Sequence, residues 1–117
     1  NDPAIASKPA VAEYIAFMTA QGNKDIVTTA SAGWHVAEVT VAILKQASES
    51  PEGLTRASIM NAARNYSLAP SLARDGVVLT MNGDVDAFQA ESLQVVQYEF
   101  ASGTFSDVGE LITDYES

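Results

Sequence analysis

Residues 34–47 decide the fold of this chain, and they read WHVAEVTVAILKQA. As a helix, this stretch has apolar side chains around most of its circumference: Val36, Ala37, Val39, Val41, Ala42, Ile43 and Leu44. A helix that is apolar on most sides is normally flanked by protein on more than one side. The rest of the sequence encodes few neighbours for such a helix. We therefore expect part of its cover to come from polypeptide outside this chain.

Two further helices are predicted, one on each side of this stretch. Residues 9–21 show an amphipathic helical pattern, with Ser7 as the N-cap, Pro9 in the first turn and Gly22 after the last turn. A third helix follows Thr55, a residue type that caps helices well. Its inner face is predicted to consist of Ile59, Met60, Ala62, Ala63 and Tyr66.

Strand signals separate and follow the helices. Residues 26–29 read IVTT, a β-branched run typical of a short buried strand of parallel type, and Ser31 would cap the helix after it. Residues 67–75 are predicted to be irregular and residues 77–80 to form a strand. Residues 93–105 alternate in polarity and contain a Ser-Gly turn, which predicts a terminal antiparallel hairpin.

The predicted fold class is therefore α/β, with three helices, one short parallel-type strand and a terminal antiparallel hairpin. Helices are expected mainly in residues 9–67 and strands mainly in residues 76–113. A complete doubly wound sheet alternates several parallel strands with helices. Only one such strand is predicted, and the chain opens at Asn1 without an initiator Met. Residues 1–117 are thus expected to be a single partial domain.

Composition and charge exclude several classes of protein. The chain has 117 residues, 47% of them hydrophobic, which suits one small globular domain or a piece of a larger one. Its 6 basic and 15 acidic residues give a net charge of −9, so no nucleic acid and no anionic lipid surface is expected as a partner. The absence of cysteine excludes disulfides and thiolate nucleophiles. Uninterrupted apolar runs are short, and on that ground no membrane span is predicted.

Motifs for catalysis are missing from the sequence. It contains neither the nucleophile string G-x-S-x-G nor the phosphate-binding string of P-loop proteins, so the chain is not expected to be an enzyme or to use a cofactor. His35 is the one histidine, and Glu38 and Ser31 lie within a turn of it, as a proton relay requires. A hydrogen-bonded helix histidine is the favoured interpretation. A lone histidine does not build the usual zinc site.

An alternating acidic segment, Asn82, Asp84 and Asp86, is similar to the start of a calcium-binding loop. Such a loop needs glycine at its sixth position and glutamate at its twelfth, where this chain has Ala87 and Leu93. The segment is therefore predicted to be a solvated turn, and no metal site is expected.

The predicted junction between residues 26–29 and the apolar helix is the candidate binding site. Ligands of α/β sheets bind where strands lead into helices. The Ser31 hydroxyl and the Trp34 indole are the groups there that suit a polar ligand atom or an apolar ligand body. Both have a structural alternative, Ser31 as a plain N-cap and Trp34 as a core residue.

The order of the segments is informative beyond each segment alone. Asp2-Pro3 opens the first helix, AGWHVA begins the second at residues 32–37, and LTRASIMNA begins the third at residues 54–62. LTMN, LQVVQY and GTF follow at residues 79–82, 93–98 and 103–105. In this order the chain resembles the C-terminal third of the type I extracytoplasmic solute-binding proteins, the receptors of ABC importers for branched-chain amino acids and related solutes. The family's Gly-Tyr-Asp-Ala motif is matched at Gly33, while Trp34, His35 and Val36 replace the other three residues.

The resemblance implies a non-enzymatic, two-lobed receptor that closes on a small solute and hands it to a membrane permease. It also implies a location outside the cytoplasmic membrane, periplasmic or lipid-anchored at the cell surface. Family members contact the amino acid mostly through residues earlier in the chain. The fragment alone is therefore expected not to bind solute usefully, and its apolar helix face would be open to self-association. An often aromatic contact falls at Thr29, whose small hydroxyl implies a bulkier or more polar ligand than a branched-chain amino acid.

A different class of protein fits the same sequence. The alternative is a small intact extracytoplasmic sensor or protein-interaction module. The long helix has two apolar rows, one of Val36, Val39 and Ile43 and one of Trp34, Val41 and Leu44. An intact module would cover both rows within one chain, whereas a fragment would expose one of them or bury it in a second copy.

Overall fold

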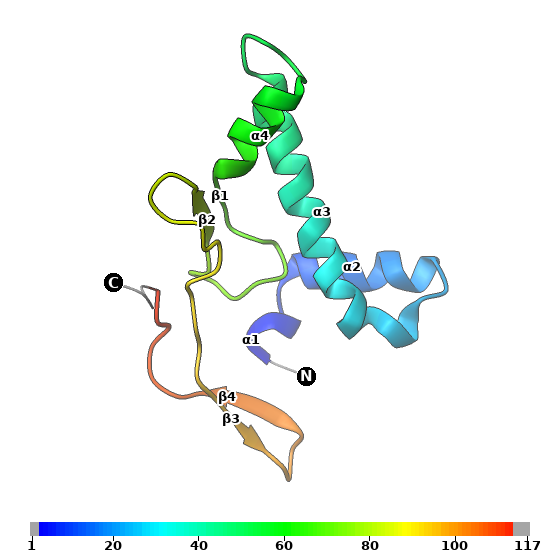
Figure 1. Ribbon diagram of the computed structural model, residues 1–117. Coiled ribbons are helices and arrows are strands. Elements are labelled where there is room, and N and C mark those ends of the chain that lie inside the picture. The colour runs from blue at the N-terminus through cyan, green and yellow to red at the C-terminus, as the bar shows by residue number, and fades with distance from the viewer. Residues whose placement is uncertain (1–2, 114–117) are drawn as a thin grey trace.

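A computed structural model describes residues 3–113 (Figure 1). Its helical elements are α1 (Pro3–Ala6), α2 (Pro9–Ala20), the 3-10 turn η1 (Lys24–Ile26), α3 (Val27–Ser48) and α4 (Arg56–Arg64). Its strands are β1 (Asn65–Leu68), β2 (Leu79–Asn82), β3 (Val96–Glu99) and β4 (Thr104–Asp107). They form two separate antiparallel pairs, β1–β2 and β3–β4. The predicted mixture of helices and strands is confirmed.

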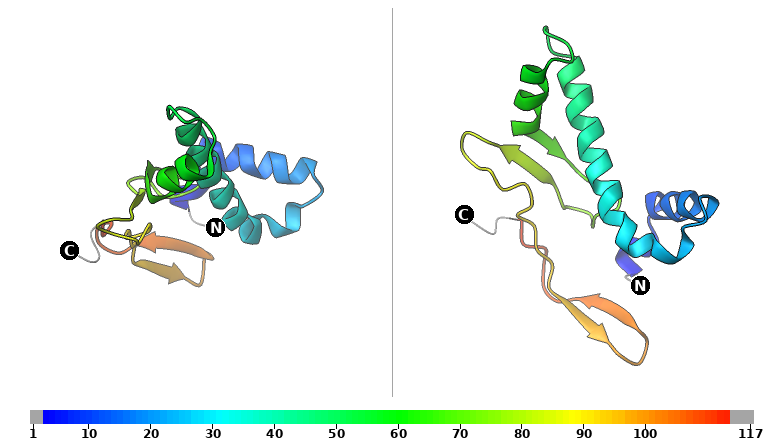
Figure 2. Two further views of the ribbon diagram at one scale, coloured as in Figure 1. Left: turned by 45° about the horizontal axis from the view of Figure 1, so that its top comes forward. Right: turned by 45° about the vertical axis from the view of Figure 1, so that its right-hand side comes forward.

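Helix α3 is the longest of the described elements, and the other long helices lie against it (Figures 1 and 2). Helix α2 lies at its N-terminal end and α4 lies beside its C-terminal end, where the small buried side chains of Ala47 and Ala62 allow close approach. The predicted cap of the third helix is confirmed. The Thr55 hydroxyl accepts from the Ser58 backbone N–H at 3.1 Å, and the Ser58 hydroxyl accepts from the Thr55 N–H at 3.0 Å, which completes a capping box.

The strand predicted at residues 26–29 is wrong. Ile26 ends η1, and α3 begins at Val27, so the IVTT run is helical. A lone strand needs a neighbouring strand to satisfy its backbone hydrogen bonds, whereas a helix satisfies them internally. None of the strands within residues 3–113 lies beside this run, and the chain continues the helix backward instead. Ser31 is therefore not an N-cap, and its hydroxyl donates to the Thr28 carbonyl at 2.7 Å inside α3.

The first predicted helix is nearly as expected. Pro9 occupies its first turn, and Gly22 follows its end with φ = +75°, a conformation that favours glycine. Its N-cap is Lys8 rather than Ser7, and no side-chain hydrogen bond caps it. The Lys8 ammonium donates instead to the Ala73 carbonyl at 2.6 Å and to the Asp75 carboxylate at 2.8 Å, which ties α2 to a distant loop.

Strand β1 was not predicted. The third helix ends at Arg64, and Tyr66, expected on its inner face, lies in β1 instead. Tyr66 faces Met81 in the register of β1 with β2 and is buried at 8% exposure. Met60, also expected inside, is 54% exposed. The predicted strand at residues 77–80 is shifted to Leu79–Asn82.

Burial raises the pKa of the Tyr66 phenol above its ordinary value of 10.0. Its stabilising contribution is thus complete below the unfolded-state pKa and is lost as pH rises through the folded-state pKa. We expect Tyr66→Phe to flatten the alkaline loss of stability that begins near the unfolded-state pKa of 10.0 and continues toward the raised folded-state pKa. Urea unfolding followed by Trp34 fluorescence measures this, because the chain has one tryptophan. Equal alkaline slopes for the two proteins would contradict it.

The predicted terminal hairpin is confirmed. Strands β3 and β4 pair antiparallel, with Tyr98 opposite Phe105 and their ring centroids 5.1 Å apart. The hairpin projects away from the helices (Figure 2). An ion pair of 2.6 Å between Arg74 and Asp107 links it to the rest of the chain. All four residues of β3 are exposed.

The buried core is small for a chain of this length. Within residues 3–113 the buried residues are Tyr14, Met18, Ala47, Ser58, Ala62, Tyr66, Pro70 and Leu72. The accessible surface is 8136 Å², whereas a compact protein of 12.3 kDa exposes about 6,100 Å². The radius of gyration is 16.8 Å against about 13 Å for a compact chain of 117 residues. Three large apolar residues of α3 are exposed, with Val36 66%, Val41 48% and Leu44 40% accessible. They come from both predicted rows, and Val39, Ile43 and Trp34 are half-buried, so neither row is exposed as a whole. We call Val36, Val41 and Leu44 the open face of α3.

One helical stretch, Lys24–Ser48, is long and apolar enough to cross a membrane by length and composition, with a mean hydropathy of 1.2. The sequence prediction considered only uninterrupted apolar runs and did not find it. In this structure the stretch packs against α2 and α4, and its Glu38 carboxylate accepts from the Ser71 backbone N–H at 3.2 Å. None of the apolar window of this stretch is buried within residues 3–113, so these contacts cover only part of the helix.

Candidate functional site

The three predicted site residues all lie in the N-terminal half of α3, but on different sides of it. Thr29 is exposed to solvent, Ser31 lines a cavity, and Trp34 packs against α2. Because the segment is a helix, successive residues are turned by about 100°. The junction predicted for Thr29, Ser31 and Trp34 is therefore not formed, and only Ser31 reaches the cavity.

The cavity beside Ser31 has a volume of about 400 Å³, and we call it the His35 pocket. Its lining comes from α1, α2, α3, the loop before β2, and β4. The lining residues are Ile5, Ala6, Val11, Tyr14, Ile15, Val27, Thr28, Ser31, His35, Leu72 and Phe105. Small-molecule sites in proteins typically measure about 300–1,000 Å³ and are mostly apolar with a few polar groups. The His35 pocket has both properties.

The polar groups of the pocket form one row along α3. Thr28, Ser31 and His35 are spaced by three and four residues, so they share a helix face. The Ser31 hydroxyl already donates to the Thr28 carbonyl at 2.7 Å, which leaves its oxygen free to accept. The Tyr14 hydroxyl across the pocket also donates, to the Val27 carbonyl at 2.6 Å, so it too can offer only its oxygen as an acceptor.

His35 is the least satisfied group of the row. Its Nε2 atom is buried and has no hydrogen-bond partner within the described residues. A buried polar atom without a partner costs about 1–3 kcal/mol. The predicted hydrogen-bonded histidine is therefore not found at this nitrogen, and the predicted relay partner Glu38 is held by Ser71.

Trp34 takes the structural alternative considered for it. Its ring meets Tyr14 and Phe17 edge to face, at centroid distances of 5.1 and 5.8 Å. Its Nε1 donates to the Ser71 hydroxyl at 3.3 Å. The indole packs against the core cluster of Tyr14, Met18 and Leu72. It thus fixes α2 and the loop before β2 to α3, next to the pocket rather than inside it.

The acidic segment behaves as the predicted turn. Asp84 forms an ion pair of 2.8 Å with Arg64, whose guanidinium also donates to the Gly83 carbonyl at 3.0 Å. Asp86 accepts from the Phe88 N–H at 2.9 Å. Within residues 3–113 no group of three or more histidine, cysteine, aspartate or glutamate side chains could hold a metal ion.

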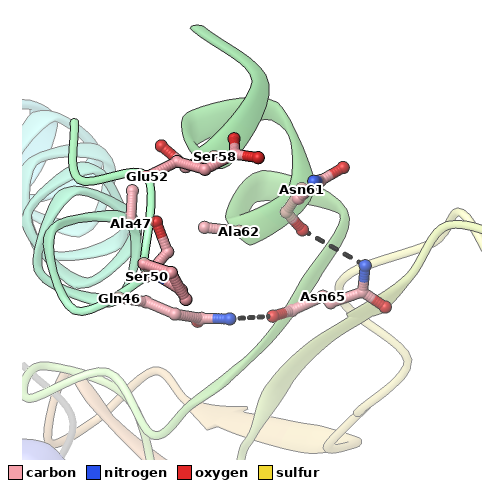
Figure 3. Close-up of a pocket in the computed structure, with 9 residues that line it drawn as sticks. Gln46, Ala47, Ser50, Glu52, Ser58, Asn61, Ala62 and Asn65 are labelled. Carbon is pink, nitrogen blue, oxygen red and sulfur yellow. Dashed lines mark hydrogen bonds between the residues drawn. The ribbon is translucent and has the colours of Figure 1, made fainter. Parts of the chain in front are cut away.

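A second cavity of about 420 Å³ lies between the C-terminal end of α3 and α4 (Figure 3). It is lined by Gln46, Ala47, Ser50, Pro51, Glu52, Ser58, Asn61, Ala62 and Asn65. Its polar groups largely bond to one another: Gln46 Nε2 donates to the Asn65 carbonyl at 2.8 Å, and Asn65 Nδ2 donates to the Asn61 carbonyl at 3.1 Å. These hydrogen bonds connect α3, α4 and β1, and Ser58 belongs to the capping box of α4. The polar residues of this cavity therefore have structural roles.

Sequence reasoning missed most of the His35 pocket. Tyr14, Leu72 and Phe105 belong to three separate parts of the chain, and no local pattern indicates that they meet. The one available signal was the single histidine placed one turn after Ser31 on the apolar helix.

Comparisons with models of protein families, with curated proteins and with solved structures find no match to this chain.

Proposed function

We propose that this chain is the C-terminal portion of the solute-binding protein of an ABC importer. The complete receptor would be two-lobed and extracytoplasmic, would lack enzymatic activity, and would pass an amino acid or related small solute to a membrane permease. The proposal rests on the order of segments described above and on the open face of α3. Within residues 3–113 nothing covers Val36, Val41 and Leu44 to the degree usual in a domain core.

The exposed surface supports an absent partner of substantial size. The chain exposes about 2,000 Å² more than a compact protein of its mass. A stable protein interface removes about 800 Å² from each partner. The excess is thus large enough for a second body of polypeptide to pack on α3 and the hairpin. A sheet of the same receptor would provide that cover.

The reading frame upstream of Asn1 tests the proposal directly. We expect an in-frame signal sequence followed by roughly two domain lengths of alternating strand and helix patterns. The complete product should then bind a small solute in calorimetry. An initiator codon directly before Asn1 would overturn the proposal.

Binding by the 117-residue chain itself gives a second test. A cleft closed from two sides loses most of its contacts when one side is missing. We therefore expect calorimetry to show no micromolar binding of any proteinogenic amino acid to this chain. Tight binding of one of them would contradict the fragment proposal and would favour the intact sensor module.

A further inference from the structure

We infer that the His35 pocket takes an uncharged small molecule with an apolar body and a single amide or hydroxyl head group. This goes beyond the proposed function, because the pocket is lined by this chain alone, whereas the proposed receptor would bind its solute between two lobes. The inference concerns the chemistry of the pocket itself, so it can be tested on the chain as it is.

The apolar wall of the pocket selects the ligand's body. Eight of the described lining residues are aliphatic or aromatic, and they come from α1, α2, α3, Leu72 and Phe105. Apolar surface removed from water contributes about 25 cal/mol per Å². A hydrocarbon chain or phenyl ring of the ligand would bury itself here.

The polar row selects the head group. The Ser31 oxygen is available as an acceptor, and His35 carries a buried nitrogen without a partner. His35 lines the cavity, but its Nε2 atom is buried beneath the cavity surface, so the imidazole must turn toward the cavity before a ligand can supply the missing partner. A primary amide fits both atoms, because its carbonyl accepts from an imidazole N–H while its NH₂ donates to Ser31.

The lack of charge in the lining excludes a zwitterion. None of the lining residues that the structure describes is an acid, a lysine or an arginine. A buried ammonium or carboxylate without a counter-charge is costly. The net charge of −9 further opposes an anion. A free amino acid would bring two unpaired charges and should bind worse than its uncharged analogue.

Three compounds with the same hydrocarbon body separate these cases. They are 3-phenylpropionamide, which is uncharged, 3-phenylpropionate, which is an anion, and phenylalanine, which is a zwitterion. Titrations of the 117-residue chain followed by protein NMR shifts should give a millimolar dissociation constant for the amide and at least a tenfold weaker one for phenylalanine, about 1.4 kcal/mol apart. Shifts should concentrate on Tyr14, Ser31 and His35.

Two variants with a matched control assign the head group. His35→Leu should weaken amide binding by about tenfold and yet raise the urea midpoint, because it removes a buried unpartnered nitrogen. A histidine with only a structural role would lower the midpoint. Ser31→Ala should weaken amide binding a few-fold. Thr40→Ala, an exposed position on the same helix outside the pocket lining, should leave binding unchanged.

Equal affinity for the amide and phenylalanine would overturn the inference, as would no binding of the amide at about 10 mM. Neither result bears on the reading frame upstream of Asn1, which tests the proposed function. Conversely, an initiator codon at Asn1 together with selective amide binding would refute the receptor while leaving the pocket's chemistry in place.

Discussion

Tyr14→Ala is expected to lower the free energy of unfolding by about 3–5 kcal/mol, the usual cost of removing a large aromatic side chain from a core. Tyr14 is 4% exposed and lies at the centre of the main core cluster. Its ring contacts Trp34, and its hydroxyl donates to the Val27 carbonyl at the first residue of α3. The variant loses the packing and the hydrogen bond together. Because the core is small, this loss is a large share of the total stability.

Phe17→Ala is the matched control for Tyr14→Ala. Phe17 also meets the Trp34 ring edge to face and belongs to the same helix, but it is 50% exposed. We expect a loss of about 1 kcal/mol, since less apolar surface returns to water. Urea unfolding followed by the fluorescence of Trp34 reports both variants. Similar losses for the two would contradict the placement of the core between α2 and α3.

The second large effect concerns association through the open face of α3. We expect the chain to self-associate at about 100 µM, because exposed apolar patches of several hundred Å² rarely stay in water. The double variant Val36→Glu with Leu44→Glu should return it to a monomer of about 12.3 kDa in light scattering. Burying two carboxylates without partners in an interface is prohibitive. Its helix content should stay unchanged, since substitutions at exposed positions alter stability by about 0.5 kcal/mol or less.

A second double variant controls for charge alone. Ala12→Glu with Ala57→Glu adds the same two charges at exposed positions of α2 and α4. It should associate as the unmodified chain does, apart from a small effect of added repulsion. An unmodified chain that is monomeric at this concentration, with one cooperative unfolding transition, would instead favour the intact module over the receptor fragment.

Local signals predicted the elements that local interactions define. Pro9 and Gly22 bound α2, Thr55 caps α4, and the Ser102-Gly103 tip joins β3 to β4. Each of these features depends on residues within one turn of helix or one hairpin. Their hydrogen bonds form within a few residues of sequence, so the sequence pattern contains them.

The errors arose where distant partners decide the outcome. The IVTT run has the composition of a strand but finds no strand beside it in the described chain, and it joins α3. β1 carries no strong strand pattern, yet pairing with β2 and the burial of Tyr66 make it a strand. The candidate site also depends on contacts between residues that are distant in the sequence. Ser31 was selected as the cap of a strand-to-helix junction that does not form, and its neighbours in the pocket, Leu72 and Phe105, are set by tertiary packing.

The hairpin of β3 and β4 has edges that can promote aggregation. Within residues 3–113 it pairs with no further strand, so each outer edge presents backbone groups to any extended segment that approaches. Phe100, 88% exposed, and Tyr98, 52% exposed, place apolar surface near the turn of the hairpin. Such edges template fibrils when concentration or heating brings copies together. Concentrated or heated solutions are therefore the conditions in which we expect this chain to aggregate through the hairpin edges.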